Sequence, residues 1–276
     1  MTAQMMVSKA VILARGLGTR MRRADQAVQL DAAQAAAADI GLKAMIPVGG
    51  GRPFLDYSLS ALADAGITDA CLIIGPEHTA VRAYYGETAR PERLRIHFAI
   101  QAEPIGTANA VLAAEEFIAG EPFLVLNSDN YYPAPVLAEL LRQSPPALPA
   151  FEPRALSERG NIPRERIAKY ALLEIAADGR LQHIREKPDA ATLARLGENA
   201  PVSMNVWLLT PRILEACRTV PRSARGEYEL PVAMEKAITE GVRVHTFPVS
   251  AAVLDLSQRA DIGTLPKYLE GLAARP

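Results

Sequence analysis

A short apolar run that leads into a basic, glycine-containing loop places the strongest constraint on this chain. Ala10–Ala14 is apolar without alternation and contains β-branched residues, which is typical of a parallel strand buried on both faces. The loop that follows reads Arg15-Gly16-Leu17-Gly18-Thr19-Arg20. Its glycines permit a tight turn whose backbone N–H groups approach a ligand closely, and its guanidinium and hydroxyl groups suit phosphate. A strand followed by such a loop in an open α/β sheet predicts a nucleoside triphosphate site.

The two commonest phosphate-binding loops do not fit this stretch. The dinucleotide fingerprint requires a third glycine where Met21 stands, and the Gly-Lys-Ser/Thr of the P-loop is absent. No acidic residue occupies the expected ribose position, which further disfavours a dinucleotide-dependent oxidoreductase. A plain strand-to-helix turn with two surface arginines remains the alternative for this loop taken alone.

Composition limits the partners of the chain. The 276 residues are 49% hydrophobic, and 30 Lys and Arg against 31 Asp and Glu give a net charge of −1. A nucleic-acid or membrane-surface binder would show a basic excess, so we expect neither partner. No apolar run approaches the roughly 18 residues of a membrane span, and no secretory signal is recognisable. Cys71 and Cys217 fit no metal-ligand spacing. We expect a cytoplasmic protein.

Strands and helices alternate through the first half of the chain. We expect strands at 70–74, 94–100 and 123–126 and helices at 54–65 and 107–118. Asp31 is expected to cap a short helix that stops at Gly41. This alternation predicts a doubly wound, mainly parallel, Rossmann-like α/β sheet.

The second half changes character after a proline-rich stretch at 144–153. We expect a hairpin of strands at 169–175 and 181–186 around Asp178-Gly179, then a strand at 202–209. Further expected elements are helices at 211–219 and 229–240, strands at 242–249 and 252–256, and a final helix at 264–273. With no clear linker, residues 1–276 are expected to form one domain with an inserted substrate-binding lobe.

Six short motifs, each weak alone, occur in a meaningful order: Leu13–Arg20; Lys43 with Pro47; Gln101 before Pro104, Gly106 and Thr107; Asp129 after an apolar strand; Glu186-Lys187-Pro188; and Asp261-Ile262-Gly263-Thr264. In this order they resemble the sugar-1-phosphate nucleotidyltransferases, the NDP-sugar pyrophosphorylases, over about residues 11–268. The resemblance implies a single nucleotidyltransferase domain that joins a nucleoside triphosphate and a sugar-1-phosphate and releases pyrophosphate.

The resemblance also implies a magnesium-dependent, in-line attack of the sugar phosphate on the α-phosphate, which depends on positioning and charge neutralisation. Asp129 and Asp261 are the carboxylates it assigns to Mg²⁺. A turn or helix-cap role is the alternative for each. Arg20 and Lys43 are expected on the triphosphate, with Asp129 as the third catalytic residue.

The remaining site residues follow from the same resemblance. Nucleotide-binding positions are Ala14, Arg15, Gly16, Leu17, Gly18, Thr19, Gln101, Gly106 and Thr107. Arg15 departs from the family's small residue, and the sequence leaves open whether it contacts phosphate or packs outward. The positions expected around the sugar and its phosphate are Tyr170, Glu186, Lys187, Asn205 and Glu227. The sugar and the base stay open, although the glutamine favours a pyrimidine.

Three points remain open beyond the site residues: the alternative function, the oligomeric state and the role of 21–42. A catalytically silent, nucleotide-sugar-binding regulatory protein on the same fold is the alternative function. We expect a homo-oligomer, but the sequence does not define its oligomeric state. Finally, 21–42 is rich in alanine, lacks proline and has few large apolar residues, so we expect a lid over the phosphates that nucleotide orders. A rigid surface helix or an oligomer contact is the alternative for this segment.

Overall fold

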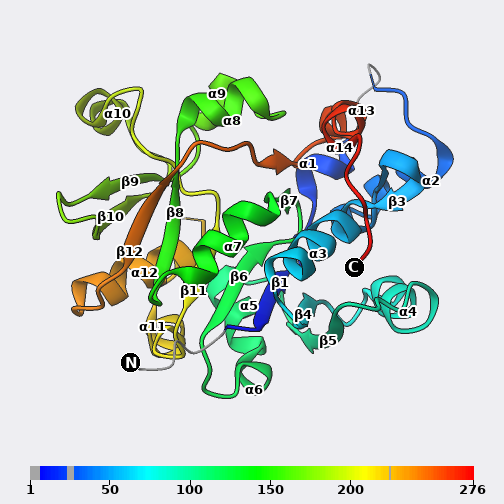
Figure 1. Ribbon diagram of the computed structural model, residues 1–276, viewed down its shortest axis with the longest axis horizontal. Coiled ribbons are helices and arrows are strands. Elements are labelled where there is room, and N and C mark those ends of the chain that lie inside the picture. Colours follow the sequence, from blue (N-terminus) through cyan, green and yellow to red (C-terminus); the bar gives the residue numbers. More distant parts are fainter. Residues whose placement is uncertain (1–6, 24–27, 224) are drawn as a thin grey trace.

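A seven-stranded sheet organises the molecule. The computed structural model describes residues 7–23, 28–223 and 225–276, and within them the strand order is β12-β8-β11-β6-β1-β4-β5 (Figure 1). In that order the strands are His245–Val249, Ala147–Phe151, Val206–Leu209, Phe123–Asn127, Lys9–Leu13, Asp69–Ile74 and Arg95–Ile100. β11 runs antiparallel to both its neighbours, and the other pairs are parallel. The predicted mainly parallel α/β sheet is therefore confirmed.

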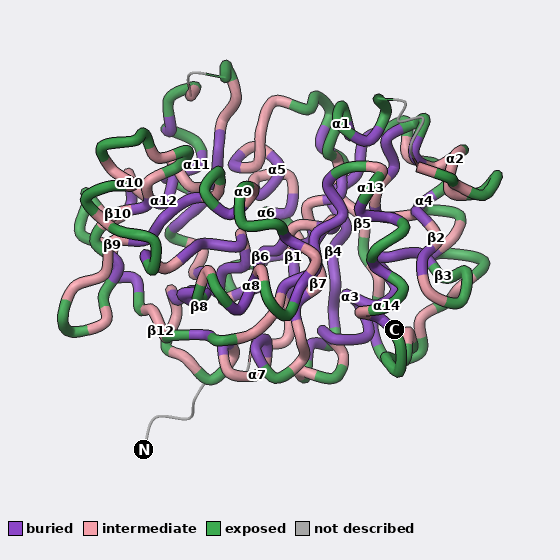
Figure 2. Tube along the Cα trace, turned by 90° about the horizontal axis from the view of Figure 1, so that it is seen from above, coloured by how far each residue is buried: buried purple, intermediate pink, exposed green. Residues whose placement is uncertain are grey.

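β1 lies in the interior of this sheet. Val11 pairs in register with Cys71 of β4 on one side and with Val125 of β6 on the other. Side chains alternate between the two faces, so Ile12 joins one hydrophobic cluster and Val11 the other. Both faces are covered, and β1, β4 and β6 are buried along most of their length (Figure 2). Burial on both faces explains why the run at the start of the chain is apolar without alternation.

Helices cover both faces of the sheet. α3 (Phe54–Ala65) and α7 (Ala134–Arg142) pack on the face of Ile12, and α5 (Thr107–Ala113), α11 (Ile213–Thr219) and α12 (Leu230–Thr239) pack on the face of Val11. The remaining α-helices are α1 (Thr19–Arg22), α2 (Ala32–Asp39), α4 (Thr79–Ala83), α6 (Glu115–Ile118), α8 (Pro153–Arg159), α9 (Arg164–Ile167), α10 (Ala190–Leu196), α13 (Arg259–Thr264) and α14 (Pro266–Leu269). Two short 3-10 helices, η1 (Lys43–Met45) and η2 (Gly49–Gly51), and one π-helix, η3 (Tyr84–Thr88), complete the set.

The chain leaves the sheet between β8 and β11. This excursion contains α8, α9, α10 and the predicted hairpin, now β9 (Leu172–Ile175) and β10 (Leu181–Arg185), which pair antiparallel. Two small pairs lie elsewhere: β2 (Pro47–Val48) with β3 (Arg52–Pro53), and β7 (Asn130–Tyr131) with β13 (Leu254–Asp255). The second of these pairs joins the segment after β6 to the C-terminal part of the chain.

The structure corrects two expectations drawn from the sequence and contains one strand that the sequence analysis did not predict. The proline-rich stretch contains a buried strand, β8, which tolerates Pro149 because β11 pairs with it only at Ala147. The single helix expected at 107–118 is divided at Ala114. The final helix does not span 264–273: α13 starts earlier, at Arg259, because the Asp261 carboxylate accepts the backbone N–H groups of Ser257 and Gln258.

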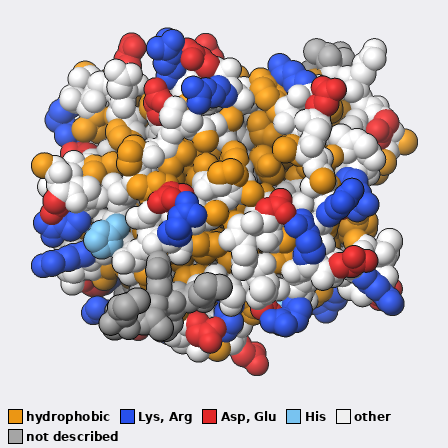
Figure 3. Space-filling model, viewed as in Figure 1, with side chains coloured by type: hydrophobic (Ala, Val, Ile, Leu, Met, Phe, Trp, Pro, Cys, Tyr) orange, Lys and Arg blue, Asp and Glu red, His pale blue; other side chains and the backbone are white. Residues whose placement is uncertain are grey.

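The surface carries charges of both signs. On the face shown in Figure 3, Lys and Arg side chains are interspersed with Asp and Glu around a central area of hydrophobic side chains. Such mixing agrees with the near-zero net charge of the sequence. Among the residues that the structure describes, no helix is long and apolar enough to cross a membrane.

Candidate active site

The phosphate-loop residues open onto a cavity of about 330 Å³ at the carboxyl ends of β1, β5 and β6. Carboxyl ends of neighbouring strands are where open α/β sheets bind ligands. The predicted residues that line this cavity are Ala14, Arg15, Gly16, Leu17, Gly18, Thr19, Arg20, Lys43, Gln101, Gly106, Thr107, Asp129 and Glu227. The structure thus brings the predicted nucleotide-binding and catalytic residues together from segments far apart in the sequence.

Gly18 fixes the shape of the loop. Its φ of 60° lies in the left-handed region, and a Cβ atom there would come within 2.4 Å of the carbonyl oxygen of Gly41. The loop therefore packs directly against the turn that precedes Lys43. This contact joins the two cationic positions expected on the triphosphate, Arg20 and Lys43.

Lys43 and Asp129 form an ion pair at the cavity wall. Lys43 Nζ lies 2.8 Å from Asp129 Oδ2, and the two side chains are 15% and 24% exposed. Asp129 follows β6, whose last residue, Asn127, pairs with Leu13 at the end of β1. The ion pair thus places a cation and a carboxylate in the cavity that the phosphate loop 14–20 also lines.

Gln101 and its neighbours form the opposite end of the cavity. Gln101 Nε2 donates to the carbonyl oxygen of Gly106 and to Asn109 Oδ1, both at 3.0 Å. Gly106 has a φ of 124°, and a Cβ atom there would lie 2.3 Å from the carbonyl oxygen of Tyr228. The Thr107 hydroxyl accepts the N–H of Leu230 at 2.8 Å. These contacts hold the 105–108 turn against the segment that carries Glu227.

The structure does not bring Asp261 to this cavity. Arg166 Nη2 lies 2.9 Å from Asp261 Oδ1, and the N–H groups of Ser257 and Gln258 both donate to Oδ2 at 2.9 Å. The carboxylate is 5% exposed and acts as a helix cap and ion-pair partner. The metal role predicted for Asp261 therefore has no support in this arrangement, and the helix-cap alternative describes its surroundings.

Asp255 is the carboxylate that lies beside Asp129. It pairs across β7–β13 with Asn130, whose Nδ2 donates to Asp255 Oδ1 at 3.1 Å, and the N–H of Leu256 donates to the carbonyl oxygen of Asp129 at 2.8 Å. Burial, and then the negative charge of Asp129, raise the pKa of the Asp255 carboxyl. The signal that could have identified it is a lone carboxylate within the apolar stretch 252–256.

Magnesium takes one or two protein carboxylates and completes its coordination shell with water and phosphate oxygens. Asp129 fits, because only its Oδ2 is hydrogen-bonded within the described residues. Asp255 is fully engaged by donors, including Arg166 and Tyr170 on Oδ2. The described residues contain no group of three or more His, Cys, Asp or Glu that could hold a metal by themselves.

Of the predicted sugar-side residues, Glu227 lines the cavity, whereas Tyr170, Glu186, Lys187 and Asn205 do not. Lys187 and Asn205 have φ values of 46° and 56°, unusual for non-glycine residues and frequent at functional sites. Desolvation, and then the charge of Glu229, raise the pKa of the exposed Glu186 carboxyl. Tyr170 donates to Asp255 Oδ2 at 3.3 Å and so belongs to the Asp255 cluster.

Arg225 was not predicted from the sequence, yet it lines the cavity beside Glu227. It also lies 3.6 Å from Glu229. No motif marks it, because an isolated arginine before a glycine is ordinary for an exposed loop.

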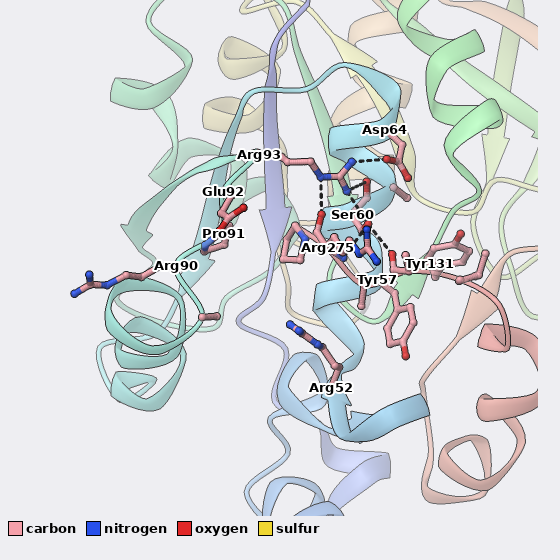
Figure 4. Close-up of a pocket in the computed structure, with 16 residues that line it drawn as sticks. Arg52, Tyr57, Ser60, Asp64, Arg90, Pro91, Glu92, Arg93, Tyr131 and Arg275 are labelled. Atoms are coloured by element: carbon pink, nitrogen blue, oxygen red, sulfur yellow. Dashed lines mark hydrogen bonds and ion pairs between the residues drawn. The ribbon is translucent and has the colours of Figure 1, made fainter.

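A larger cavity of about 550 Å³ lies elsewhere, among α3, the η3–β5 connection and the C-terminal residues (Figure 4). None of the predicted site residues lines it. Arg93, its best-connected cation, is paired with Asp64 at 2.5 Å, Ser60 Oγ at 2.8 Å and the carbonyl oxygen of Arg275 at 2.6 Å. These interactions hold the C-terminal residues on α3, and the predicted nucleotide-binding and catalytic residues gather at the smaller cavity instead.

Known proteins share both the sequence pattern and the fold. A glucose-1-phosphate thymidylyltransferase of Streptomyces griseus is 27% identical over 92% of this chain and 64% of its own length. The UTP–glucose-1-phosphate uridylyltransferase YngB of Bacillus subtilis is 28% identical over 93% of this chain and 85% of its own length. The chain thus spans a little under two thirds of some of the curated relatives it matches.

A solved structure of UDP-glucose pyrophosphorylase complexed with UDP-glucose superimposes with a TM-score of 0.73 at 17% identity, covering 96% of this chain and 99% of that one. The sequence profile described as Nucleotidyl transferase matches residues 39–275. The chain belongs to the nucleotidyl transferase family.

Proposed function

We propose that this protein joins a nucleoside triphosphate and a sugar-1-phosphate to give an NDP-sugar and pyrophosphate. The observation that carries the proposal is the cavity in which the loop 14–20 faces the Lys43–Asp129 ion pair. Family membership and relatives named as thymidylyl-, uridylyl- and guanyltransferases support it.

The chain's own residues bind and align the reactants in this reaction. An oxygen of the sugar phosphate attacks the α-phosphorus, the bond from that phosphorus to the bridging oxygen breaks, and pyrophosphate leaves with the electron pair. Loop amides and Arg20 hold the triphosphate, and Lys43 neutralises charge that develops on the leaving pyrophosphate. We infer that Lys43 exchanges its contact with Asp129 for a phosphate contact when nucleotide binds.

Magnesium fits this scheme through Asp129, whose Oδ1 is free of hydrogen bonds within the described residues. Bound Mg²⁺ supplies charge neutralisation at the reacting phosphates. We propose no direct contact between Mg²⁺ and Asp261, because Arg166 and backbone N–H groups already bind its carboxylate. We propose that Asp255 shapes the site from behind Asp129.

On the acceptor side, Lys187 is proposed to bind the sugar phosphate, and Glu186 and Glu227 to hold sugar hydroxyls. Tyr170 and Asn205 are proposed to shape the sugar pocket. The left-handed backbone at Lys187 supports a functional constraint there. The homo-oligomer and the cytoplasmic location expected from the sequence stay predictions.

Pyrophosphate release across a grid of nucleoside triphosphates and sugar-1-phosphates, with Mg²⁺, tests the proposal. Release that requires one triphosphate and one sugar phosphate together supports it. A protein that binds both classes of ligand but releases no pyrophosphate with any pair would instead be the silent regulatory protein. Asp129→Asn supplies the matched inactive control for contaminating activity.

A further inference from the structure

Arg15 is buried without enough hydrogen-bond partners. Its side chain is 8% exposed, and Nε and Nη1 have no acceptor among the described residues. Within the described part of the chain its side chain makes one polar contact, a long one, from Nη2 to both carboxylate oxygens of Glu77 at 3.4 Å. A buried donor left unpaired costs roughly 1–3 kcal/mol. Because Arg15 also lines the cavity, a small movement of its guanidinium would let a ligand provide the missing acceptor.

The strand order places Arg15 between the two ends of the site. β1 lies between β6 and β4, and β5 lies beyond β4. Asp129 follows β6 and Gln101 follows β5, so a nucleotide that reaches both must cross the ends of β1 and β4. Arg15 follows β1 by two residues and contacts Glu77, which follows β4. The guanidinium therefore lies along the path from the triphosphate to the base.

Gln101 presents an acceptor at the base end. Both hydrogens of its Nε2 have acceptors within the protein, Gly106 and Asn109, which leaves Oε1 to receive a hydrogen bond. The side chain is 4% exposed and cannot easily turn to water. Arg15 therefore provides N–H donors and Gln101 an oxygen acceptor in the lining of the same cavity.

We propose that Arg15 donates to a carbonyl oxygen of the nucleobase while Gln101 accepts the adjacent ring N–H. This inference rests on the proposed function and names the substrate class. Uracil, thymine and guanine carry a carbonyl beside a ring N–H, whereas cytosine and adenine carry an amino group beside a bare ring nitrogen. The site then selects keto bases over amino bases.

A phosphate contact fits Arg15 less well. The Glu77 carboxylate beside it would repel a phosphate but not an uncharged carbonyl. Glu77 is also 55% exposed, and its ion-pair contacts are long, 3.4 Å to Arg15 and 3.7 Å to His78, so its carboxylate can move aside when a base arrives. Arg20 and Lys43, in contrast, line the cavity and, among the described residues, have no carboxylate other than Asp129 as an ion-pair partner.

Calorimetric binding of UTP, GTP, CTP, ATP and inorganic tripolyphosphate to the full chain tests this inference. For the wild-type protein we expect UTP or GTP to bind at least about 10-fold more tightly than CTP and ATP. Arg15→Ala should weaken binding of that preferred triphosphate about 10- to 150-fold, the range for one charge-assisted hydrogen bond. Binding of CTP, ATP and tripolyphosphate should change less than about threefold.

Two further variants separate the explanations. Arg15→Lys keeps the charge and most of the volume, so it should fold but not restore the base preference. Arg22→Ala removes an exposed guanidinium from the same segment and should leave the preference unchanged. An equal loss for all four triphosphates and tripolyphosphate in Arg15→Ala overturns the inference, because Arg15 would then be a phosphate contact. So does full rescue by lysine. A wild-type protein that binds no triphosphate overturns the proposed function as well.

Discussion

Arg166→Gln removes the cation that the structure places between two buried carboxylates. Arg166 Nη1 lies 2.8 Å from Asp255 Oδ2 and 3.1 Å from Asp261 Oδ2, and Nη2 lies 2.9 Å from Asp261 Oδ1. The arginine side chain is 13% exposed and the carboxylates 4% and 5%. Glutamine retains the polar character of the side chain but leaves both negative charges without their counter-charge.

Breaking a buried ion pair from one side costs roughly 3–5 kcal/mol. Asp261 keeps the N–H groups of Ser257 and Gln258, and Asp255 keeps Asn130 and the Ser257 hydroxyl. Because these donors still solvate the charges, we expect a loss at the lower end, about 3 kcal/mol in the free energy of unfolding.

Urea unfolding at pH 7.5 and at pH 5 measures this loss. The pKa of Asp255 is already raised by burial and by Asp129. A carboxyl with a raised folded-state pKa destabilises the fold increasingly as the pH rises through that pKa, and loss of Arg166 raises it further. The deficit of Arg166→Gln should therefore be smaller at pH 5 than at pH 7.5.

Asp261→Asn in the Arg166→Gln background supplies the control, because it removes one uncompensated charge. It should cost less there than in the wild-type protein. A loss below 1 kcal/mol for Arg166→Gln, or fully additive effects of the two substitutions, would refute the assignment of a buried, mutually dependent cluster.

Four other outcomes are expected. Asp129→Asn should lower turnover at saturating Mg²⁺ by about 10²–10³ with unchanged circular dichroism. Lys187→Ala should weaken sugar-phosphate binding about 10- to 150-fold and leave triphosphate affinity unchanged in titrations. Arg195 and, to a smaller extent, Arg185 lower the pKa of the Glu174 carboxyl to about 2. At pH 7 the wild-type protein should therefore be more stable than Glu174→Gln, and urea unfolding should show this difference decline as the pH falls from about 4.5 to 2. Hydrogen exchange should find α2 protected before nucleotide is added. Protection that appears only with triphosphate would instead support a lid at 21–42.

Elements with a clear apolar pattern, either a continuous run or a helical repeat, were predictable from the sequence. The apolar runs of β1, β4 and β6 and the helix at Phe54–Ala65 lie where the pattern places them, because burial on both faces of a sheet leaves an unambiguous mark. β8 was not predictable in this way. Its prolines indicate a loop locally, and only the limited pairing with β11 makes Pro149 acceptable in a buried strand.

The candidate site likewise contains residues that could be predicted from the sequence and residues that could not. Residues that closely follow strand ends, such as Arg15, Gln101 and Asp129, gather in one cavity because the carboxyl ends of neighbouring strands meet there. Asp255 and Asp261 could not be told apart by motif order alone. Which carboxylate faces Asp129 depends on the β7–β13 register, a long-range pairing that no local pattern encodes.

The segment between Arg20 and Lys43 illustrates the same limit. Its alanine-rich composition indicates few buried contacts, and residues 24–27 lie outside the described part of the chain. Yet Met21 and Ala38 are fully buried, and Gln34 Nε2 donates to the carbonyl oxygen of Pro47 at 3.0 Å. Arg259 binds both the Met21 carbonyl oxygen and the Asp39 carboxylate. These anchors come from residues distant in sequence, so composition could not reveal them. They favour a rigid wall beside the phosphate loop over a lid.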